Sequence, residues 1–378
     1  MNGFLKKTLA CVLAAATAVV CLCACNNTPA DGKEEEMFAF KELTATQGDV
    51  LVYGRQESLS TAQAFFGESV QGLFAQKGES KYWHYQGGSY EVWLDRIRHD
   101  YGKNTRDVTL DQMAEDYFAA FGKDYVLFDV ANEESVNCAR SIAGVKQVAM
   151  IDVSLREWAE GKGMTQRYDA TQTTSEEVFH EYKDLFDKTG LVQQKGSLIQ
   201  LTDYAIACKY FCYFVTSMKP AALTFRNEVQ DWCRECAVYG WCPVDEGTDV
   251  DFSSRYGSFT LASDYCYNMS LLSCKNLFGK EAFTQPNAPA IEREYATNKH
   301  YVTIVNSDGD NLQCWYGGTF KQAHYMGADR GNFPFGWSVS PALYSLAPLI
   351  LNDTYKNAQA GDRFVCSVTG LGYTYPMS

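Results

Sequence analysis

The sequence lacks an excess of positive charge. Its 378 residues carry 33 Lys and Arg against 46 Asp and Glu, which gives a formal net charge of −13 at pH 7. Because nucleic-acid phosphates are bound by surfaces rich in Lys and Arg, this balance argues against a nucleic-acid partner. The hydrophobic share of 46 % is ordinary for a globular protein and excludes a chain that is disordered throughout.

Several motifs of catalysis and cofactor binding are also missing. The sequence contains no GxSxG, P-loop or GxGxxG, and its five histidines form neither HExxH nor HxH. Gly370 and Gly372 lack the third glycine and the following helix of a dinucleotide-binding loop. Cys233, Cys236 and Cys242 have metal-like spacing, but no second CxxC follows to complete a zinc site.

Long apolar runs are absent except at the N-terminus. Two lysines at positions 6 and 7 precede the uncharged residues 8–24. A basic start followed by a short apolar run predicts a signal peptide over residues 1–24. No later segment has the roughly eighteen uncharged apolar residues that a spanning helix needs, so we expect no further membrane crossing.

The end of the apolar run resembles a bacterial lipobox. Residues 22–25 have the sequence LCAC, with an apolar residue at position −3 and a small one at −1 before Cys25. The resemblance implies that Cys25 is lipidated, so that the protein is exported and held at the outer face of the bacterial cell membrane. A signal cleaved without lipidation and an uncleaved anchor are the alternatives. Residues 25–37 are mostly polar and predict a flexible tether.

Strand-like and helix-like segments alternate through the rest of the chain. In residues 38–218, the runs YVLFDV (125–130) and VAMIDVS (148–154) are typical of buried strands between helices. This alternation predicts an N-terminal α/β domain with a parallel sheet, and residues 203–215 form an apolar segment that predicts a buried helix. Residues 219–378 repeat the alternation and predict a barrel-like (β/α) domain. Its strands are expected near residues 236–244, 258–264, 301–307, 334–339 and 363–369.

Acidic, amide and aromatic residues follow these later strands. Because the carboxyl ends of parallel strands meet at one edge of a sheet, we expect them to converge on one pocket. The catalytic candidates are Asp308, Asp310, Glu246 and Asp264, and the candidates for substrate contacts are Asn311, Trp337, Tyr373, Tyr375 and Asn268.

This set of side chains suits a saccharide. Carboxylates and amides can bind hydroxyl groups, and two carboxylates across a glycosidic bond can act as acid and nucleophile, or as acid and base. The alternative is that these residues only build turns, since Asp, Asn and Gly are common in βα loops. The crowded Asp308 and Asp310 could also hold Ca²⁺, although their segment lacks the ligand spacing of an EF-hand.

The sequence GLGYTYP at residues 370–376 resembles the signature of the GxGYxYP family, carried by Gly370, Gly372, Tyr373, Tyr375 and Pro376. The similarity continues upstream in four segments: WCPVDEG (241–247), SRYGSFTLASDYCYNMS (254–270), YVTIVNSDGDNLQ (301–313) and GWSVSPALYSLAP (336–348). The resemblance implies a glycoside hydrolase in which an N-terminal domain precedes the domain that carries the motif.

The chain ends at Ser378, soon after the motif. The family's domain is expected to continue further, and a closed barrel of this type needs about eight strands, more than are predicted here. We therefore expect a C-terminally truncated barrel. Two alternatives to the hydrolase stay open, namely a glycan-binding surface lipoprotein without catalysis and an inactive, truncated family member.

Ten of the fourteen cysteines follow the lipobox. Their scatter does not resemble the framework of a small disulfide-rich domain, and Cys208 and Cys212 lie one helical turn apart in an apolar segment. Buried free thiols are therefore predicted, with one or two disulfides or a metal site as alternatives.

Overall fold

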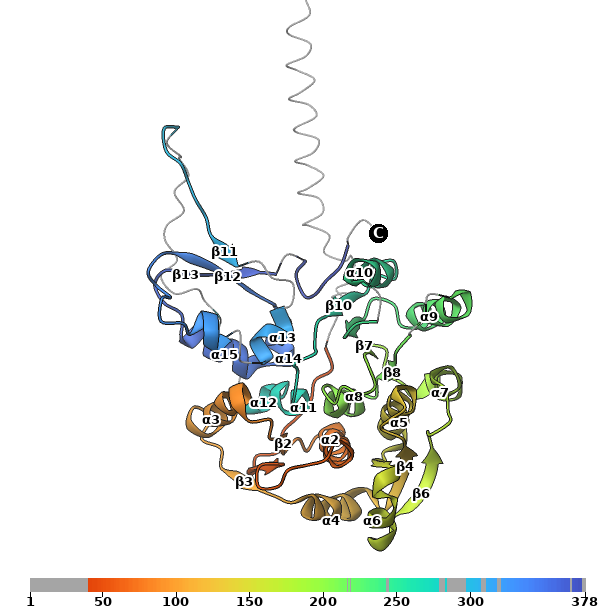
Figure 1. Cartoon of the computed structure of the whole chain (residues 1–378). Helices are drawn as coiled ribbons and strands as arrows, with labels where there is room; N and C mark the ends of the chain where they lie inside the picture. The colour runs from red at the N-terminus through yellow and green to blue at the C-terminus, as the bar shows by residue number, and fades with distance from the viewer. Residues whose placement is uncertain are drawn as a thin grey trace, which may run out of the picture. The chain divides into compact units, whose positions relative to one another are not determined.

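The computed structural model describes residues 40–215, 217, 219–242, 245–278, 283, 297–306, 311–317, 321–367 and 369–375. In Figure 1 these residues form small sheets surrounded by helices. Every pairing between two strands of these sheets is parallel. The α/β class predicted from the sequence is therefore confirmed.

The first sheet has the strand order β2-β1-β3. Its strands are β1 (Val50–Tyr53), β2 (Tyr82–His84) and β3 (Thr105–Asp107), and its helices are α2 (Thr61–Gln76), η1 (Gly88–Tyr90) and α3 (Glu91–His99). Helix α2 starts with a capping box in which Ser60 and Gln63 satisfy each other's backbone N–H groups. Most of α2 is buried, because it packs against α8 (Thr202–Cys208) of a later segment.

The second sheet has the order β5-β4-β6. Its strands are β4 (Asp124–Phe128), β5 (Ala149–Asp152) and β6 (Thr165–Asp169), and the helices around it are α4 (Leu110–Phe121), α5 (Glu133–Lys146), η2 (Val153–Leu155), α6 (Arg156–Gly161), α7 (Ser175–Tyr182) and η3 (Lys183–Leu185). The two runs predicted as buried strands form β4 and β5, which lie side by side with Tyr125 opposite Ala149.

The third sheet has the order β10-β9-β7-β8. Its strands are β7 (Gly190–Gln193), β8 (Phe211–Tyr213), β9 (Ala237–Tyr239) and β10 (Phe259–Leu261), and its helices are α8, α9 (Pro220–Trp232), α10 (Glu246–Ser254), α11 (Met269–Leu272) and α12 (Lys275–Phe278). The predicted helix over 203–215 is wrong after Cys208, because Lys209 adopts a left-handed conformation and the chain continues into β8. An apolar run of this length does not distinguish a buried helix from a buried strand.

The fourth sheet has the order β11-β12-β13. Its strands are β11 (Val305–Asn306), β12 (Phe335–Val339) and β13 (Asp362–Cys366), and its helices are α13 (Asn311–Tyr316), the π-helical turn η4 (Lys321–Tyr325), α14 (Leu343–Leu346) and α15 (Pro348–Lys356). The strands after residue 219 thus lie in two open sheets, and the third sheet also includes β7 and β8 from before that residue.

The ten cysteines of the described residues are free, and eight of them are buried, as the sequence predicts. Within the same residues, no group of three or more His, Cys, Asp or Glu side chains is arranged to hold a metal ion. No described helix is both long enough and apolar enough to cross a membrane.

Candidate functional site

The GxGYxYP motif lies along β10. Tyr373 and Thr260 form an antiparallel bridge in which each backbone N–H donates to the other's carbonyl at 2.8 Å. A Cβ at Gly372 would lie 2.6 Å from the Thr260 carbonyl oxygen, so only glycine permits this approach. Gly370 has a φ of +80°, a left-handed conformation that glycine adopts without strain. The motif glycines therefore let the C-terminal segment contact the third sheet.

The motif brings aromatic rings to the start of α10. The ring centroids of Trp241 and Tyr373 are 5.4 Å apart. The backbone N–H of Tyr375 donates to Ser254 Oγ at 2.8 Å, and the Tyr375 hydroxyl would lie 3.7 Å from a Cβ placed on Gly247. We call the surface formed by Trp241, Asp245, Glu246, Tyr373 and Tyr375 the motif surface.

The two acidic residues of the motif surface differ in role. Asp245 is the N-cap of α10, where its side chain accepts from the Thr248 backbone N–H at 2.9 Å and from the Thr248 hydroxyl at 2.6 Å. These hydrogen bonds from Thr248 lower the pKa of the Asp245 carboxyl. Glu246 lies in the first helical turn and is exposed. The Glu246 side chain is thus open to solvent, whereas the Asp245 carboxylate caps the helix.

Asp264 and Asn268 occupy different environments after β10. Asp264 is partly buried, and its backbone N–H donates to the Gln313 side chain of α13 at 2.8 Å. Asn268 is fully buried, and its amide accepts from the His84 backbone N–H at 2.6 Å and donates to the His84 carbonyl at 3.0 Å. The structure places Asn268 in the interior, where it holds the end of β2.

Trp337 lines a cavity of about 420 Å³ whose lining includes no residue of the motif surface. This C-terminal cavity is lined by Asn306, Phe335 and Trp337 of the fourth sheet and by eight residues of the segment 323–333. The Trp337 indole donates to Asp362 at 2.8 Å, and Asp362 also pairs with Arg330 at 2.8 Å. The described site residues therefore do not converge on one pocket: Asn268 lies in the interior and Trp337 lines the C-terminal cavity, while Glu246, Tyr373 and Tyr375 belong to the motif surface. Asp308, Asp310, Pro376, Cys25 and the side chain of Asn311 lie outside the described residues.

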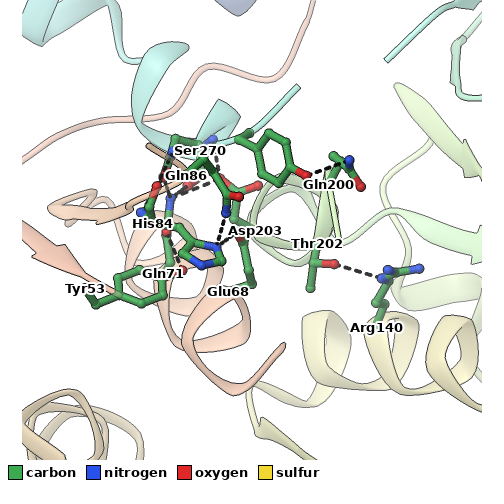
Figure 2. Close-up of polar contacts among 12 residues, drawn as sticks. Tyr53, Glu68, Gln71, His84, Gln86, Arg140, Gln200, Thr202, Asp203 and Ser270 are labelled. Atoms are coloured by element: carbon green, nitrogen blue, oxygen red, sulfur yellow. Dashed lines mark hydrogen bonds and ion pairs between the residues drawn. The ribbon is translucent and has the colours of Figure 1, made fainter. Parts of the chain in front are cut away.

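A buried polar cluster was not predicted from the sequence. Figure 2 shows Glu68 of α2, His84 of β2 and Asp203 of α8 meeting in the interior, where their exposed fractions are 1 %, 6 % and 0 %. Glu68 Oε1 lies 2.7 Å from His84 Nδ1. Asp203 Oδ2 accepts from the Gln71 amide at 3.2 Å and from the Ser270 backbone N–H at 2.9 Å. We call these five residues the Glu68 cluster.

Burial controls protonation in the Glu68 cluster. It raises the pKa of Glu68 to about 8 and that of Asp203 to about 7, and it lowers the pKa of His84 to about 4. At neutral pH, Glu68 is therefore largely protonated and donates to Nδ1 of a neutral His84. The Gln86 amide nitrogen lies 2.9 Å from the same ring nitrogen, so the single lone pair of Nδ1 is shared between the Glu68 hydroxyl and the Gln86 amide as donors. The ring proton of His84 then sits on Nε2.

We expect the pH dependence of stability to report this protonation. A carboxyl group whose pKa is higher in the folded state than in the unfolded state stabilises the fold fully at pH values below its unfolded-state pKa. This stabilisation is lost as the pH rises through the folded-state pKa. Because the pKa of His84 is lowered, its titration makes the fold more stable as the pH rises, but only below about pH 6.5, the ordinary pKa of histidine. Between pH 6.5 and 8.5 the free energy of unfolding should fall by about 2 kcal/mol through Glu68, and Asp203, whose pKa is also raised, adds to the fall in the same direction.

Glu68→Gln tests this expectation, because an amide can donate to His84 Nδ1 without ionising. Urea unfolding across this pH range should show a flatter dependence for Glu68→Gln than for the natural chain. The exposed Glu79, paired with Lys77 at 3.1 Å, supplies the control Glu79→Gln, which should keep the natural slope. Equal slopes for Glu68→Gln and the natural chain would contradict the assigned protonation.

The sequence carried only a weak signal for this cluster. Glu68 is the one acidic residue in the otherwise apolar or uncharged segment TAQAFFGESVQGLFAQ, and Asp203 stands in the first turn of an apolar helix. A charge in a segment that is buried on most sides indicates a partner in the interior. The partner could not be named, because Glu68, His84 and Asp203 come from distant segments.

Two parts of the chain are similar to domains of a known protein family. Residues 298–378 match the model described as "GxGYxYP putative glycoside hydrolase C-terminal domain", and residues 188–274 match the "GxGYxYP third domain". Two segments of this chain therefore match the GxGYxYP family. The second match contains all four strands of the third sheet, and the first contains the fourth sheet and the motif. No curated protein sequence matches the chain.

A solved structure shares the fold. It is the crystal structure of a protein described as a "putative hydrolase" from Bacteroides thetaiotaomicron VPI-5482, and the TM-score is 0.79 at 24 % sequence identity. The similarity covers 90 % of this chain and 66 % of that chain, so the present chain spans about two thirds of the length of its structural relative. At this identity the likeness establishes the arrangement of helices and sheets.

Proposed function

We propose that this protein is a glycoside hydrolase of the bacterial cell surface, exported and anchored through a lipid on Cys25. The match of residues 298–378 to a family domain described as "putative glycoside hydrolase" carries the proposal. The description of the solved relative as a "putative hydrolase" supports the same reaction class. Its substrate would be an oligosaccharide or polysaccharide, and nucleic acid is not a partner.

Carboxylates would perform the cleavage. We assign this chemistry to Asp308 and Asp310, with Glu246 and Asp264 as further acidic groups of the site. One protonated carboxyl would donate to the glycosidic oxygen, while an ionised carboxylate attacks the anomeric carbon or activates water. The acid needs a pKa raised by burial or by a neighbouring carboxylate, which two aspartates so close in sequence can provide.

The motif surface would bind the sugar chain. Trp241, Tyr373 and Tyr375 supply ring faces that can cover the apolar faces of sugar rings, and Tyr375 is 46 % exposed. Glu246 is exposed beside them and can accept hydrogen bonds from hydroxyl groups. The second candidate function is a glycan-binding lipoprotein without catalysis. It would use the same contacts, because these aromatic rings could bind a glycan whether or not it is cleaved.

Two variants separate the candidate functions. Tyr375→Ala should weaken glycan binding roughly three- to tenfold, because one aromatic contact with the sugar is lost. Glu246→Gln should reduce turnover more than it weakens binding, because the amide keeps the shape and loses the charge. The measurements are binding by calorimetry and reducing-end release on the same glycan.

Asp231→Asn is the matched control, since Asp231 is an exposed carboxylate outside the motif surface that pairs with Arg234. It should match the natural chain in both measurements. Binding that survives in Glu246→Gln without any turnover in the natural chain would favour the glycan-binding protein. If Tyr375→Ala leaves glycan binding unchanged, the motif surface is not the binding site of a glycoside hydrolase or of a glycan-binding lipoprotein.

A further inference from the structure

A second cavity lies against the Glu68 cluster, apart from the motif surface. Its volume is about 500 Å³, within the range of roughly 300–1,000 Å³ that small-molecule sites occupy. Its lining comes from the segment between β1 and α2 and the start of α2, from the end of β2 and the two residues after it, from the turn before α8, and from Tyr267 after β10. The lining residues are Gly54, Ser58, Leu59, Thr61, Ala64, His84, Tyr85, Gln86, Ser197, Leu198, Ile199, Gln200 and Tyr267.

No Lys, Arg, Asp or Glu appears among these lining residues. They are glycine and hydroxyl, amide, aromatic and apolar side chains, together with the imidazole of His84. Arg55 lies over the Tyr85 ring at 5.0 Å, but Asp107 and Glu91 already pair with it at 3.2 Å and 3.7 Å. An anionic ligand would therefore find no uncompensated cation in this lining.

His84 offers a donor to the cavity. Its Nδ1 is occupied by Glu68 and Gln86, and the Tyr53 ring stacks on its face at 4.8 Å. The opposite edge of the ring faces Gly54, whose Cβ position would lie 3.5 Å from His84 Cδ2, next to Nε2. Within the part of the chain that the structure describes, Nε2 has no hydrogen-bond partner. Figure 2 shows the ring fixed between Gln86 and Glu68.

Gln200 offers an acceptor. Its side chain is about nine-tenths buried, and its Oε1 has no hydrogen-bond partner among the described residues. Its Nε2 donates to the Tyr267 hydroxyl at 2.7 Å, which orients the amide, and the Tyr90 ring packs edge-on against Tyr267 at 5.1 Å. A buried acceptor left unpaired costs free energy that a ligand hydroxyl would recover.

We propose that this cavity binds one uncharged sugar unit, which receives a hydrogen bond from His84 Nε2 and donates one to Gln200 Oε1. The aromatic rings of Tyr267 and Tyr85 would cover the apolar face of the bound sugar ring. Glu68 is a positioning residue, because its hydroxyl fixes the His84 tautomer. The inference goes beyond the proposed hydrolysis, since binding here uses none of the carboxylates assigned to cleavage.

Ligand-observed NMR titration of the full chain tests the proposal. The probes are the methyl glycosides of glucose, galactose, mannose and N-acetylglucosamine, with the uronic acid and the amino sugar of the same ring configuration as the charged counterparts of each. At least one neutral probe should bind saturably, and its charged counterparts should bind about tenfold more weakly. Failure of every neutral probe to bind, or equal binding of the charged sugars, would overturn the proposal.

Variants locate the binding. Gln200→Leu should raise the Kd of the neutral probe roughly three- to tenfold, the effect of one lost neutral hydrogen bond. Tyr267→Phe provides a second variant with a smaller loss, because Gln200 keeps its place but loses its orienting partner. Phe333→Ala, in the C-terminal cavity, is the control and should leave the Kd unchanged. An unchanged Kd in both Gln200→Leu and Tyr267→Phe would contradict the assignment.

The His84 tautomer gives an independent spectroscopic signature. Long-range ¹H–¹⁵N correlations should show the ring proton on Nε2 at pH 7, and a proton on Nδ1 would overturn the assigned donor. The NMR titration and the tautomer measurement do not depend on cleavage, so they can be interpreted even if the protein has no hydrolase activity. If this cavity binds no sugar, the proposed hydrolysis is unaffected.

Discussion

Arg226→Met is expected to lower the free energy of unfolding by about 3–5 kcal/mol, because it leaves the Asp249 carboxylate buried without its cation. The exposed fractions of Arg226 and Asp249 are 1 % and 0 %, and their side chains form a direct ion pair. Gln193 donates to both Asp249 oxygens at 3.1 Å and 3.0 Å. Burial already raises the pKa of Asp249 with Arg226 in place. Removing the cation therefore leaves a group that neither water nor a charge can stabilise.

The loss should extend to the motif surface. Asp249 lies on α10, the helix whose first residue is Glu246, so the buried pair fixes that helix against α9. The Phe252 ring, also on α10, lies 4.0 Å from the Arg226 guanidinium carbon. Loss of the pair should reduce glycan binding together with stability.

An exposed ion pair close to Arg226 in the sequence provides the control. Arg234 and Asp231 have exposed fractions of 56 % and 64 %, so Arg234→Met should cost less than about 1 kcal/mol. The double variant Arg226→Met/Asp249→Asn should be more stable than Arg226→Met, because no charge is then left alone. Denaturant unfolding of the set supplies the values. Equal losses for Arg226→Met and Arg234→Met would refute the buried-pair account.

Asp310→Asn is expected to reduce turnover of a cleaved glycan by about 10²–10⁴-fold, the usual contribution of a general acid or base. Asp308→Asn should act similarly, since the proposed reaction needs one carboxyl as acid and another carboxylate as nucleophile or base. Asparagine keeps the size of the side chain and cannot carry a proton or a charge to the glycosidic bond. The control Asp231→Asn should retain turnover, and all three variants should unfold at similar denaturant concentrations.

Retention of full turnover in both aspartate variants would remove Asp308 and Asp310 from the chemistry. Loss of turnover together with loss of stability would instead assign them a role in folding. The readout is therefore kcat and KM on a single glycan, measured beside the unfolding midpoint of each variant.

Local pattern predicted much of the secondary structure. The β-branched and aromatic runs at 125–130 and 148–154 form β4 and β5, because such runs fit a sheet buried on both faces. The division into separate sheets was not predictable, since strand pairing depends on long-range contacts. The segment 203–215 shows the limit, because hydrophobicity alone is compatible with helix and strand, and a left-handed Lys209 decides between them.

The sequence predicted which types of side chain follow the strands better than it predicted where those side chains lie in the fold. Asp245 follows β9 as expected from the sequence, but its carboxylate is used as a helix cap. Asn268 follows β10 and turns inward to the His84 backbone. Asp and Asn serve turns, caps and ligands alike, so sequence position cannot separate these roles. The motif residues, in contrast, meet at one surface because Gly370 and Gly372 permit a close approach to β10.

Cleavage of glycosidic bonds is the proposed activity of this chain. Incubation of the natural chain with a panel of oligosaccharides and polysaccharides, followed by quantification of new reducing ends, tests it most directly. New reducing ends are expected from at least one glycan, and they should be lost in Asp310→Asn. A folded protein that binds a glycan of the panel yet releases no reducing ends from any of them would contradict the proposed activity.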